Sequence, residues 1–362
     1  MRWILFFLVS TTGCSPLNAY EADGLRWLSG EIRTAKNGHR EVRIPVEETD
    51  GALLITLEAM PGQLVHVHHL YHPDGATLFD AEIEADQVRS ITSAGYLDNT
   101  VTLNWPPLPY TPWLEPGNWW VDVGVTDLRG NYERGEVWVD VLFKPVTPEG
   151  GTLPVTMVYA GDAIDDEDLL EGTREAVEVW RDMYANVGID LEVIEATYPH
   201  ADLEPPGYGS ANHYRSISEG SGTGRVNVVV VSGLLSEPDV YGIAGDIPAP
   251  LVTSSDSAVL VSGELARGVD GVFSEEELRI YSETLAHEVG HLLGLFHPVE
   301  ADFSLWDALE DTPECARERG CENDLSDNLM FPYPVCSFTE CVPQDRLTID
   351  QGGVLQRYVG VR

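Results

Sequence analysis

The sequence is short of positive charge. It has 21 lysines and arginines against 60 aspartates and glutamates, and its formal net charge is −39. A chain this acidic repels the phosphate backbone of nucleic acids and has no basic stripe that could release counterions from it. We therefore exclude nucleic acid as a partner. The same excess of carboxylates favours solubility outside the cell.

The sequence also lacks a long hydrophobic run. The apolar stretch from Trp3 to Val9 follows Arg2 and is too short to cross a bilayer, but it is typical of an export signal. The stretch Leu8 to Cys14 (LVSTTGC) resembles a bacterial lipobox, in which the cysteine is lipidated and becomes the new N-terminus. We therefore predict a signal at residues 1–14 and an exported protein, held in the cell envelope through Cys14 or released outside the cell. An ordinary cleaved signal peptide is the alternative, and we expect no other contact with a membrane.

Cysteine is scarce. The chain has five, and all except Cys14 fall in one short segment. An even number of clustered cysteines in an exported protein predicts two disulfides, and the sequence does not choose among the three pairings. Their spacing lacks the Cys-x-x-Cys pairs of a zinc ribbon, which disfavours a structural metal site built from all four thiolates. The four are Cys315, Cys321, Cys336 and Cys341.

The chain shows two kinds of periodicity in turn. A content of 43% apolar and 22% charged residues over 362 positions is enough for two folded domains. In the first part, short apolar runs alternate with period two between turn signals such as Pro73-Asp74-Gly75, which predicts an all-β sandwich over residues 20–145. Its expected strands include Leu53–Leu57, Leu64–His68, Thr100–Asn104, Trp119–Val125 and Glu136–Leu142.

After a Pro- and Gly-rich linker at residues 144–151, helical spacing appears between apolar strands. This order predicts an α/β layer, of the α+β kind, over residues 152–362. Between two of its strands, Thr197–Gly224 is rich in Gly, Ser and Pro and is expected to be a surface insertion. The expected strands are Leu153–Tyr159, Ile189–Ile194, Arg225–Val231 and Ser254–Gly263; the expected helices are Asp166–Val187 and one capped by Ser274 and Glu277 that runs to about Leu293.

The segment from His287 to His297, with the sequence HEVGHLLGLFH, carries the chemistry. On a helix, His287 and His291 project from the same face, and Glu288 lies beside them. Gly294 can take the left-handed conformation that ends a helix and lets the chain return His297 as a third nitrogen ligand. Three neutral imidazoles would leave one position of a zinc ion open for water. The alternative, a helix whose histidines only fill core or surface, gives Glu288 no purpose.

This segment resembles the extended zinc motif of the metzincins. That clan also has a methionine turn, which Asp327 to Pro332 (DNLMFP) resembles; the resemblance makes Met330 the hydrophobic floor beneath the three ligands. Among metzincins, the likeness is strongest to the pappalysin family, because of Asp311-Thr312-Pro313, the flanking cysteines, and Leu347 to Gln351. In that family a tyrosine follows the methionine by two residues. Here Pro332 occupies that position, so Tyr333 is the candidate that stabilises the oxyanion.

The resemblance implies a metzincin-type catalytic domain and hydrolysis of peptide bonds in protein or peptide substrates. Zinc would activate a water, and Glu288 would be the general base. The segment Tyr241–Ala244 resembles the edge strand along the metzincin cleft, where an extended substrate could pair; an ordinary edge strand or loop is the alternative. Two other functions stay open: a surface-binding lipoprotein with a vestigial zinc domain, and a zinc hydrolase of a non-peptide bond.

Two further groups of residues could bind metal. Histidines 66, 68, 69 and 72 cluster in the first domain, where half-exposed strand histidines are the alternative to a second metal site. A run of carboxylates could ligate calcium, although negative charge at a helix N-terminus is the simpler explanation. That run consists of Asp162, Asp165, Asp166, Glu167 and Asp168.

Overall fold

The computed structural model describes residues 16–22, 24–84, 89–147, 150–200, 203–206, 211–234, 239–268, 271–337 and 341–362. Cys14 and the rest of the expected export signal lie outside the described residues. The chain forms two compact units. The first comprises Met1–Gln87, Thr92–Pro106 and Tyr110–Thr147, and the second comprises Val88–Ile91, Pro107–Pro109 and Pro148–Arg362.

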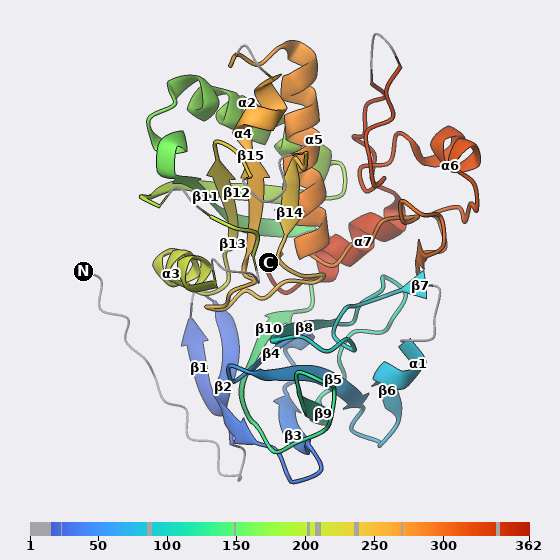
Figure 1. Ribbon diagram of the computed structural model, residues 1–362. Helices are drawn as coiled ribbons and strands as arrows, with labels where there is room; N and C mark the ends of the chain where they lie inside the picture. The colour runs from blue at the N-terminus through green and yellow to red at the C-terminus, as the bar shows by residue number, and fades with distance from the viewer. Residues whose placement is uncertain are drawn as a thin grey trace. The chain divides into compact units, whose positions relative to one another are not determined.

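The first unit contains two antiparallel sheets (Figure 1). One has the order β1-β2-β10-β4-β8 and the other β3-β9-β5-β6, and the short helix α1 (Ala81–Glu84) follows β6. The strands of the first sheet are β1 (Asn18–Ala22), β2 (Leu25–Arg33), β10 (Glu136–Pro145), β4 (Asp50–Ala59) and β8 (Thr100–Trp105). Those of the second are β3 (His39–Val46), β9 (Gly117–Asp127), β5 (Gln63–Tyr71) and β6 (Thr77–Asp80).

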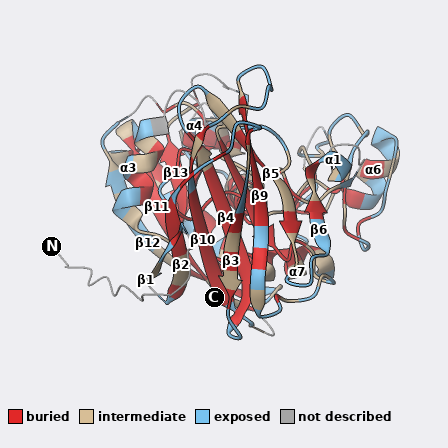
Figure 2. Ribbon diagram, turned by 90° about the horizontal axis from the view of Figure 1, so that it is seen from below, coloured by how far each residue is buried: buried red, intermediate tan, exposed pale blue. Residues whose placement is uncertain are grey.

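Both sheets contribute alternate apolar residues to one core. Val137, Val139 and Val141 of β10 belong to the same buried cluster as Val121 and Val123 of β9. Figure 2 shows β4 and β10 buried over most of their length. Strands β4, β5, β8, β9 and β10 coincide with the five expected from the sequence, whereas β1, β2 and β3 were not anticipated.

The second unit is built on a mixed sheet with the order β12-β11-β13-β15-β14. Its first four strands pair in parallel, and β14 pairs antiparallel with β15 as the last strand of the sheet. Helices α2 and α5 pack against each other and against this sheet (Figure 1). The strands are β11 (Gly151–Ala160), β12 (Ile189–Tyr198), β13 (Val226–Val231), β14 (Gly242–Ala244) and β15 (Ala258–Ser262); the helices are α2 (Glu167–Ala185) and α5 (Glu275–Leu292).

The prediction for the segment Thr197–Gly224 is wrong. A surface insertion was expected, but part of this segment forms helix α3 (Ala211–Ser221). Tyr214 and Ile217 of α3 are buried in a cluster with Val229 of β13 and with other residues of the sheet. The Gly, Ser and Pro content concealed these widely spaced apolar positions, which cover a face of the sheet.

Short elements complete the second unit. Among the described residues, no helix is both long and apolar enough to span a membrane. Two disulfides join the clustered cysteines, with the pairings Cys315–Cys321 and Cys336–Cys341. The remaining elements are η1 (Gly161–Ile164), α4 (Gly263–Arg267), α6 (Glu318–Leu325), α7 (Ile349–Arg357) and the parallel pair β7 (Arg89–Ser90) with β16 (Trp306–Asp307).

Candidate metal centre

Helix α5 positions the first two histidines. Its N-terminus is closed by the expected capping box, in which Ser274 accepts from the backbone N–H of Glu277 and the Glu277 side chain accepts from that of Ser274. The helix ends at Leu292, and Gly294 follows with a φ of 109°. Such a positive φ suits glycine, because a side chain is strained there. The chain turns at this point, as predicted.

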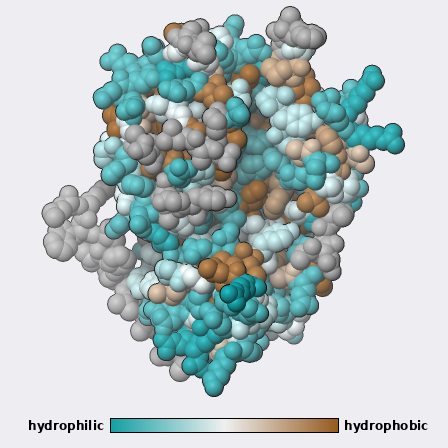
Figure 3. All heavy atoms as spheres, viewed as in Figure 1, coloured by the Kyte–Doolittle hydropathy of each residue, from teal (hydrophilic) through white to brown (hydrophobic). Residues whose placement is uncertain are grey.

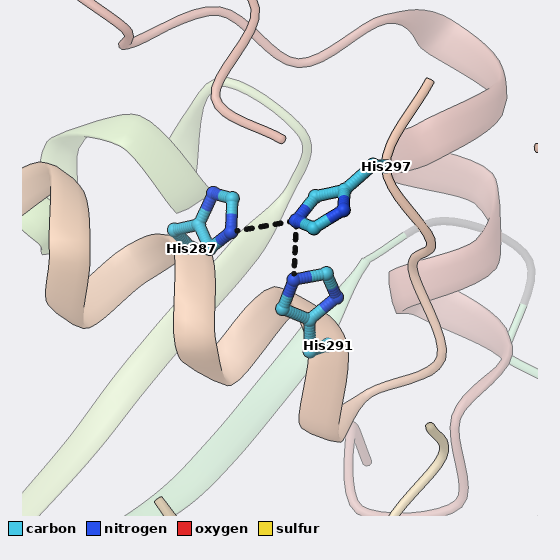
Figure 4. A group of neighbouring side chains, drawn as sticks. All are labelled: His287, His291 and His297. Carbon is cyan, nitrogen blue, oxygen red and sulfur yellow. Dashed lines mark hydrogen bonds between the residues drawn. The ribbon is translucent and has the colours of Figure 1, made fainter. Parts of the chain in front are cut away.

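The three histidine rings point toward one another (Figure 4). The Nε2 atom of His297 lies 3.1 Å from Nε2 of His291 and 3.4 Å from Nε2 of His287. Zinc–nitrogen bonds of about 2.0–2.1 Å in a tetrahedron place the ligand atoms about 3.3 Å apart. The geometry therefore fits three corners of a tetrahedral zinc site.

The second nitrogen of each ring supports this arrangement. Nδ1 of His287 lies 2.7 Å from the carbonyl oxygen of Leu329, and Nδ1 of His291 lies 2.7 Å from that of Leu295. Because a carbonyl only accepts, each Nδ1 must donate, which leaves the Nε2 lone pair free on a neutral ring. Lone pairs that face each other at these distances repel unless a cation lies between them. The donor chemistry therefore fits zinc.

Burial keeps the rings of His287 and His291 uncharged. Burial first, and His297 second, lower the pKa of His287 to about 3, and the same two causes hold the pKa of His291 well below its ordinary value. Nδ1 of His297 lies 3.0 Å from Oε2 of Glu300. Neutral imidazole is the form that binds a metal ion.

Glu288 lies between α5 and the edge strand β14. A Cβ atom on Gly242 would lie 2.6 Å from Cγ of Glu288, so the strand approaches the glutamate this closely only because residue 242 is a glycine. Burial raises the pKa of Glu288 to about 8, and a hydrogen bond from the backbone of Ala244 opposes that shift. The carboxyl group thus lies beside both the histidines and β14.

Met330 is fully buried and packs against the helix at Gly290. A Cβ atom on Gly290 would lie 2.6 Å from the sulfur of Met330, so the thioether occupies the space that a side chain at position 290, next to His291, would take. The turn before Met330 is held in place by Asn328, which accepts from the backbone N–H of Met330 at 2.9 Å and donates to Gln351 of α7 at 2.9 Å. The methionine is therefore fixed by contacts on both sides.

A cleft of about 510 Å³ opens at these residues. It is lined by the three histidines, Glu288, β14 and the segment after Met330, and its walls are mostly apolar. The surface between β14 and the segment that carries α6 is hollowed and bears hydrophobic side chains (Figure 3). Tyr333 also lines the cleft, and its hydroxyl group is buried without a hydrogen-bond partner.

The acidic run at the start of α2 has a structural role at Asp166. This carboxylate accepts from the backbone N–H of Leu169 at 2.9 Å and pairs with Arg267 at 2.6 Å, and Arg267 lowers its pKa. Asp166 is therefore a helix cap with its own counter-charge, as the simpler explanation held. The calcium hypothesis gains no support.

Sequence reasoning missed the groups that orient the ligands. Two of them, the carbonyl oxygens of Leu329 and Leu295, belong to the backbone, so no side chain marks them in the sequence. Glu300 follows His297 by three residues, and an acidic residue so close to a metal-binding histidine could have been recognised as its partner.

No protein-family model matches this sequence, and no curated protein matches it either. Solved structures that are similar in part include the following two. A metalloproteinase-II from Bacteroides fragilis is 13% identical with a TM-score of 0.28, over 81% of this chain and 77% of that one. An archaemetzincin from Methanopyrus kandleri is 16% identical with a TM-score of 0.33, over 59% of this chain and 98% of that one. These values do not assign the chain to a family.

Proposed function

We propose that the protein is an exported zinc-dependent endopeptidase of the metzincin type, with a pappalysin-like catalytic domain. The observation that carries the proposal is the convergence of the His287, His291 and His297 Nε2 atoms at spacings of 3.1 and 3.4 Å, with their Nδ1 atoms engaged elsewhere. These three residues would hold the ion. When bound, zinc supplies a Lewis acid that polarises a carbonyl group and makes a water more acidic.

Glu288 is the proposed general base. Its carboxylate takes a proton from the attacking water and then delivers it to the nitrogen of the departing amine. Strand β14 lies so close to the Glu288 side chain that even a Cβ atom on Gly242 would overlap it. This close packing holds the carboxylate next to the ligands. Met330 would keep the ligand rings in place from beneath. Tyr333 has a free hydroxyl group in the same cleft, which makes it the candidate donor to the developing oxyanion.

The cleft suits a peptide substrate. Strand β14 ends its sheet, so an extended peptide could pair with its open edge through main-chain hydrogen bonds while its side chains enter the apolar cleft. The two disulfides support export, because such bonds persist in oxidising compartments. A lipid anchor at Cys14 and an N-terminal β-sandwich as accessory domain complete the proposal.

A Glu288→Gln variant tests this function. The amide keeps the shape of the carboxyl group but cannot accept the water's proton, so cleavage of an unfolded protein substrate should fall at least about 100-fold. The zinc content of the variant should stay at that of the unaltered protein. The matched control is Glu275→Gln, an exposed carboxylate in the first turn of the same helix, which should cleave normally.

The outcomes separate the remaining hypotheses. Loss of cleavage in Glu288→Gln with zinc retained, and loss of cleavage in the unaltered protein after chelation, support the proposal. Undiminished cleavage in Glu288→Gln refutes the assigned mechanism. A zinc-loaded protein that leaves every peptide in a random library intact is either a hydrolase of another bond or a binding protein.

A further inference from the structure

The outer face of the second sheet in the first unit gathers histidines from separate strands. In β9, Val121, Val123 and Val125 enter the core, so the alternating positions 122 and 124 face outward. In β3, Val42 and Ile44 enter the core, so the alternate positions, which include His39, face outward. The three strands are adjacent in the order β3-β9-β5, which places their outward side chains in one row.

A bulge in β5 lets two consecutive histidines, His68 and His69, share this face. Val67 pairs with Val123 and His69 pairs with Asp122, so His68 is an extra residue without its own partner position. Val67 and Leu70 are both buried in the core, and the two residues between them both face outward. Without the bulge, strict alternation would send one of these two histidines inward.

The outward side chains meet at Asp122. Nδ1 of His39 lies 3.2 Å from Oδ2 of Asp122, and Nδ1 of His69 lies 3.7 Å from the same atom. One donor atom from each of His39, His68 and Asp122 lies within 4.8 Å of the other two. In a tetrahedral zinc site this spacing is about 3.3 Å, which half-buried imidazoles can reach through a small rotation.

Several polar atoms in this cluster are buried without a hydrogen-bond partner. They include Nδ1 of His68 and Oδ1 of Asp122. A buried carboxylate oxygen without a donor is unfavourable, and a bound ion or water is one way in which a protein satisfies such an atom.

The neighbouring residues support the cluster from its sides. A Cβ atom on Gly124 would overlap Nε2 of His66, so only a glycine at this position leaves room for that ring. The hydroxyl group of Tyr132 lies 3.4 Å from the same nitrogen. Asp80 lies 3.5 Å from Nε2 of His69 and adds negative charge beside the cluster. These contacts hold the histidine rings in one packed layer.

We propose that His39, His68 and Asp122 form a second metal site, which takes a divalent first-row transition ion such as zinc. Two imidazoles and one carboxylate suit zinc, copper or nickel, whereas calcium and magnesium require oxygen ligands. Nδ1 of His69 lies 3.7 Å from the same carboxylate, at the side of the proposed site. This site stands apart from the proposed peptidase function and holds whether or not that proposal is right.

Metal titration of the full chain tests the site. Protein stripped with a chelator is dialysed against zinc, and bound metal is counted by mass spectrometry for the unaltered chain, the double variant His39→Ala/His68→Ala, and the control His72→Ala. His72 is a half-buried histidine of the same unit that pairs with Asp74 and Glu115 instead. The expected result is one ion fewer per chain in the double variant than in the unaltered protein and no change in the control.

A difference of one ion per chain would support the second metal site whether or not the first site binds zinc, because His287, His291 and His297 are unchanged in all three proteins. Equal metal content in the double variant and the unaltered chain overturns the proposal. If the double variant misfolds by circular dichroism, Asp122→Asn serves instead, because the amide keeps the shape but loses the charge. Its affinity for the second ion should fall at least about tenfold, and an unchanged affinity also overturns the proposal.

Discussion

Replacement of Gly242 by alanine should strongly lower the peptidase activity, although it changes none of the three zinc ligands. The added Cβ atom would lie 2.6 Å from Cγ of Glu288, 3.1 Å from Cγ2 of Thr284 and 3.2 Å from Cγ1 of Val261. Non-bonded carbon atoms prefer about 3.5–4.0 Å. The Glu288 side chain must therefore move by about 1 Å, because it is the nearest of the three and the most flexible.

A displacement of this size is large for a general base. A misplacement of about 1 Å lowers the rate about 100-fold, which corresponds to about 2.7 kcal/mol in the activation free energy. The three histidines are untouched, so zinc content should stay unchanged. Stability should fall by about 1–3 kcal/mol at most, the usual effect of one extra methyl group in a packed site.

The assay is kcat/KM on a fluorogenic peptide from a cleavage library, measured together with bound zinc. The matched control is Gly320→Ala in α6, where an added Cβ would meet nothing within 4 Å. In that helix alanine should leave activity unchanged and stabilise the protein by about 0.5–1 kcal/mol. Wild-type kcat/KM in Gly242→Ala would refute the placement of Glu288 against β14.

Two further predictions concern stability. Met330→Ala should lower the free energy of unfolding by about 2–5 kcal/mol, because it leaves a cavity at a fully buried position. Met330→Leu keeps most of the volume and should lower the free energy of unfolding by less than about 1.5 kcal/mol. Equal urea midpoints for the two variants would contradict the packing of Met330 against Gly290. Burial raises the pKa of Asp307 from 3.8 to about 7, so the folded carboxyl group keeps its proton to higher pH than the unfolded one. This carboxyl group alone should thus lower the free energy of unfolding by about 4 kcal/mol between pH 4 and pH 7, roughly its two pKa values, and urea denaturation of zinc-loaded Asp307→Asn should lack that contribution to the pH dependence.

The candidate metal centre was predictable because its ligands are close in sequence. His287 and His291 are one helical turn apart, and Gly294 marks the end of the helix before His297. Helical geometry alone then brings the three rings together. The contacts that adjust the site were not predictable, since Gly242 and Gly290 matter through atoms on distant segments. Nothing local distinguishes these glycines from the others among the 34 in the chain.

The strands before residue 51 were missed for identifiable reasons. In β2, Gly30 occupies the inward position between Leu28 and Ile32, because the carbonyl oxygen of Pro16 lies where a Cβ would be. That glycine interrupts the apolar alternation. In β3, Pro45 argues against a strand, yet β3 lies at the edge of its sheet, where proline is tolerated. Both strands obey the alternation rule once tertiary contacts are known.

The histidine cluster of the first unit shows why register decides a site of this kind. Sequence spacing placed His66 and His68 on one face of a strand, and this much follows from period two. The same rule assigns His69 to the opposite face, and only the bulge between Val67 and His69 reverses that assignment. His39 and Asp122 join from β3 and β9 through pairings that no local pattern encodes. A metal site on a helix can therefore be read from spacing, whereas one across strands depends on a register that a single inserted residue changes.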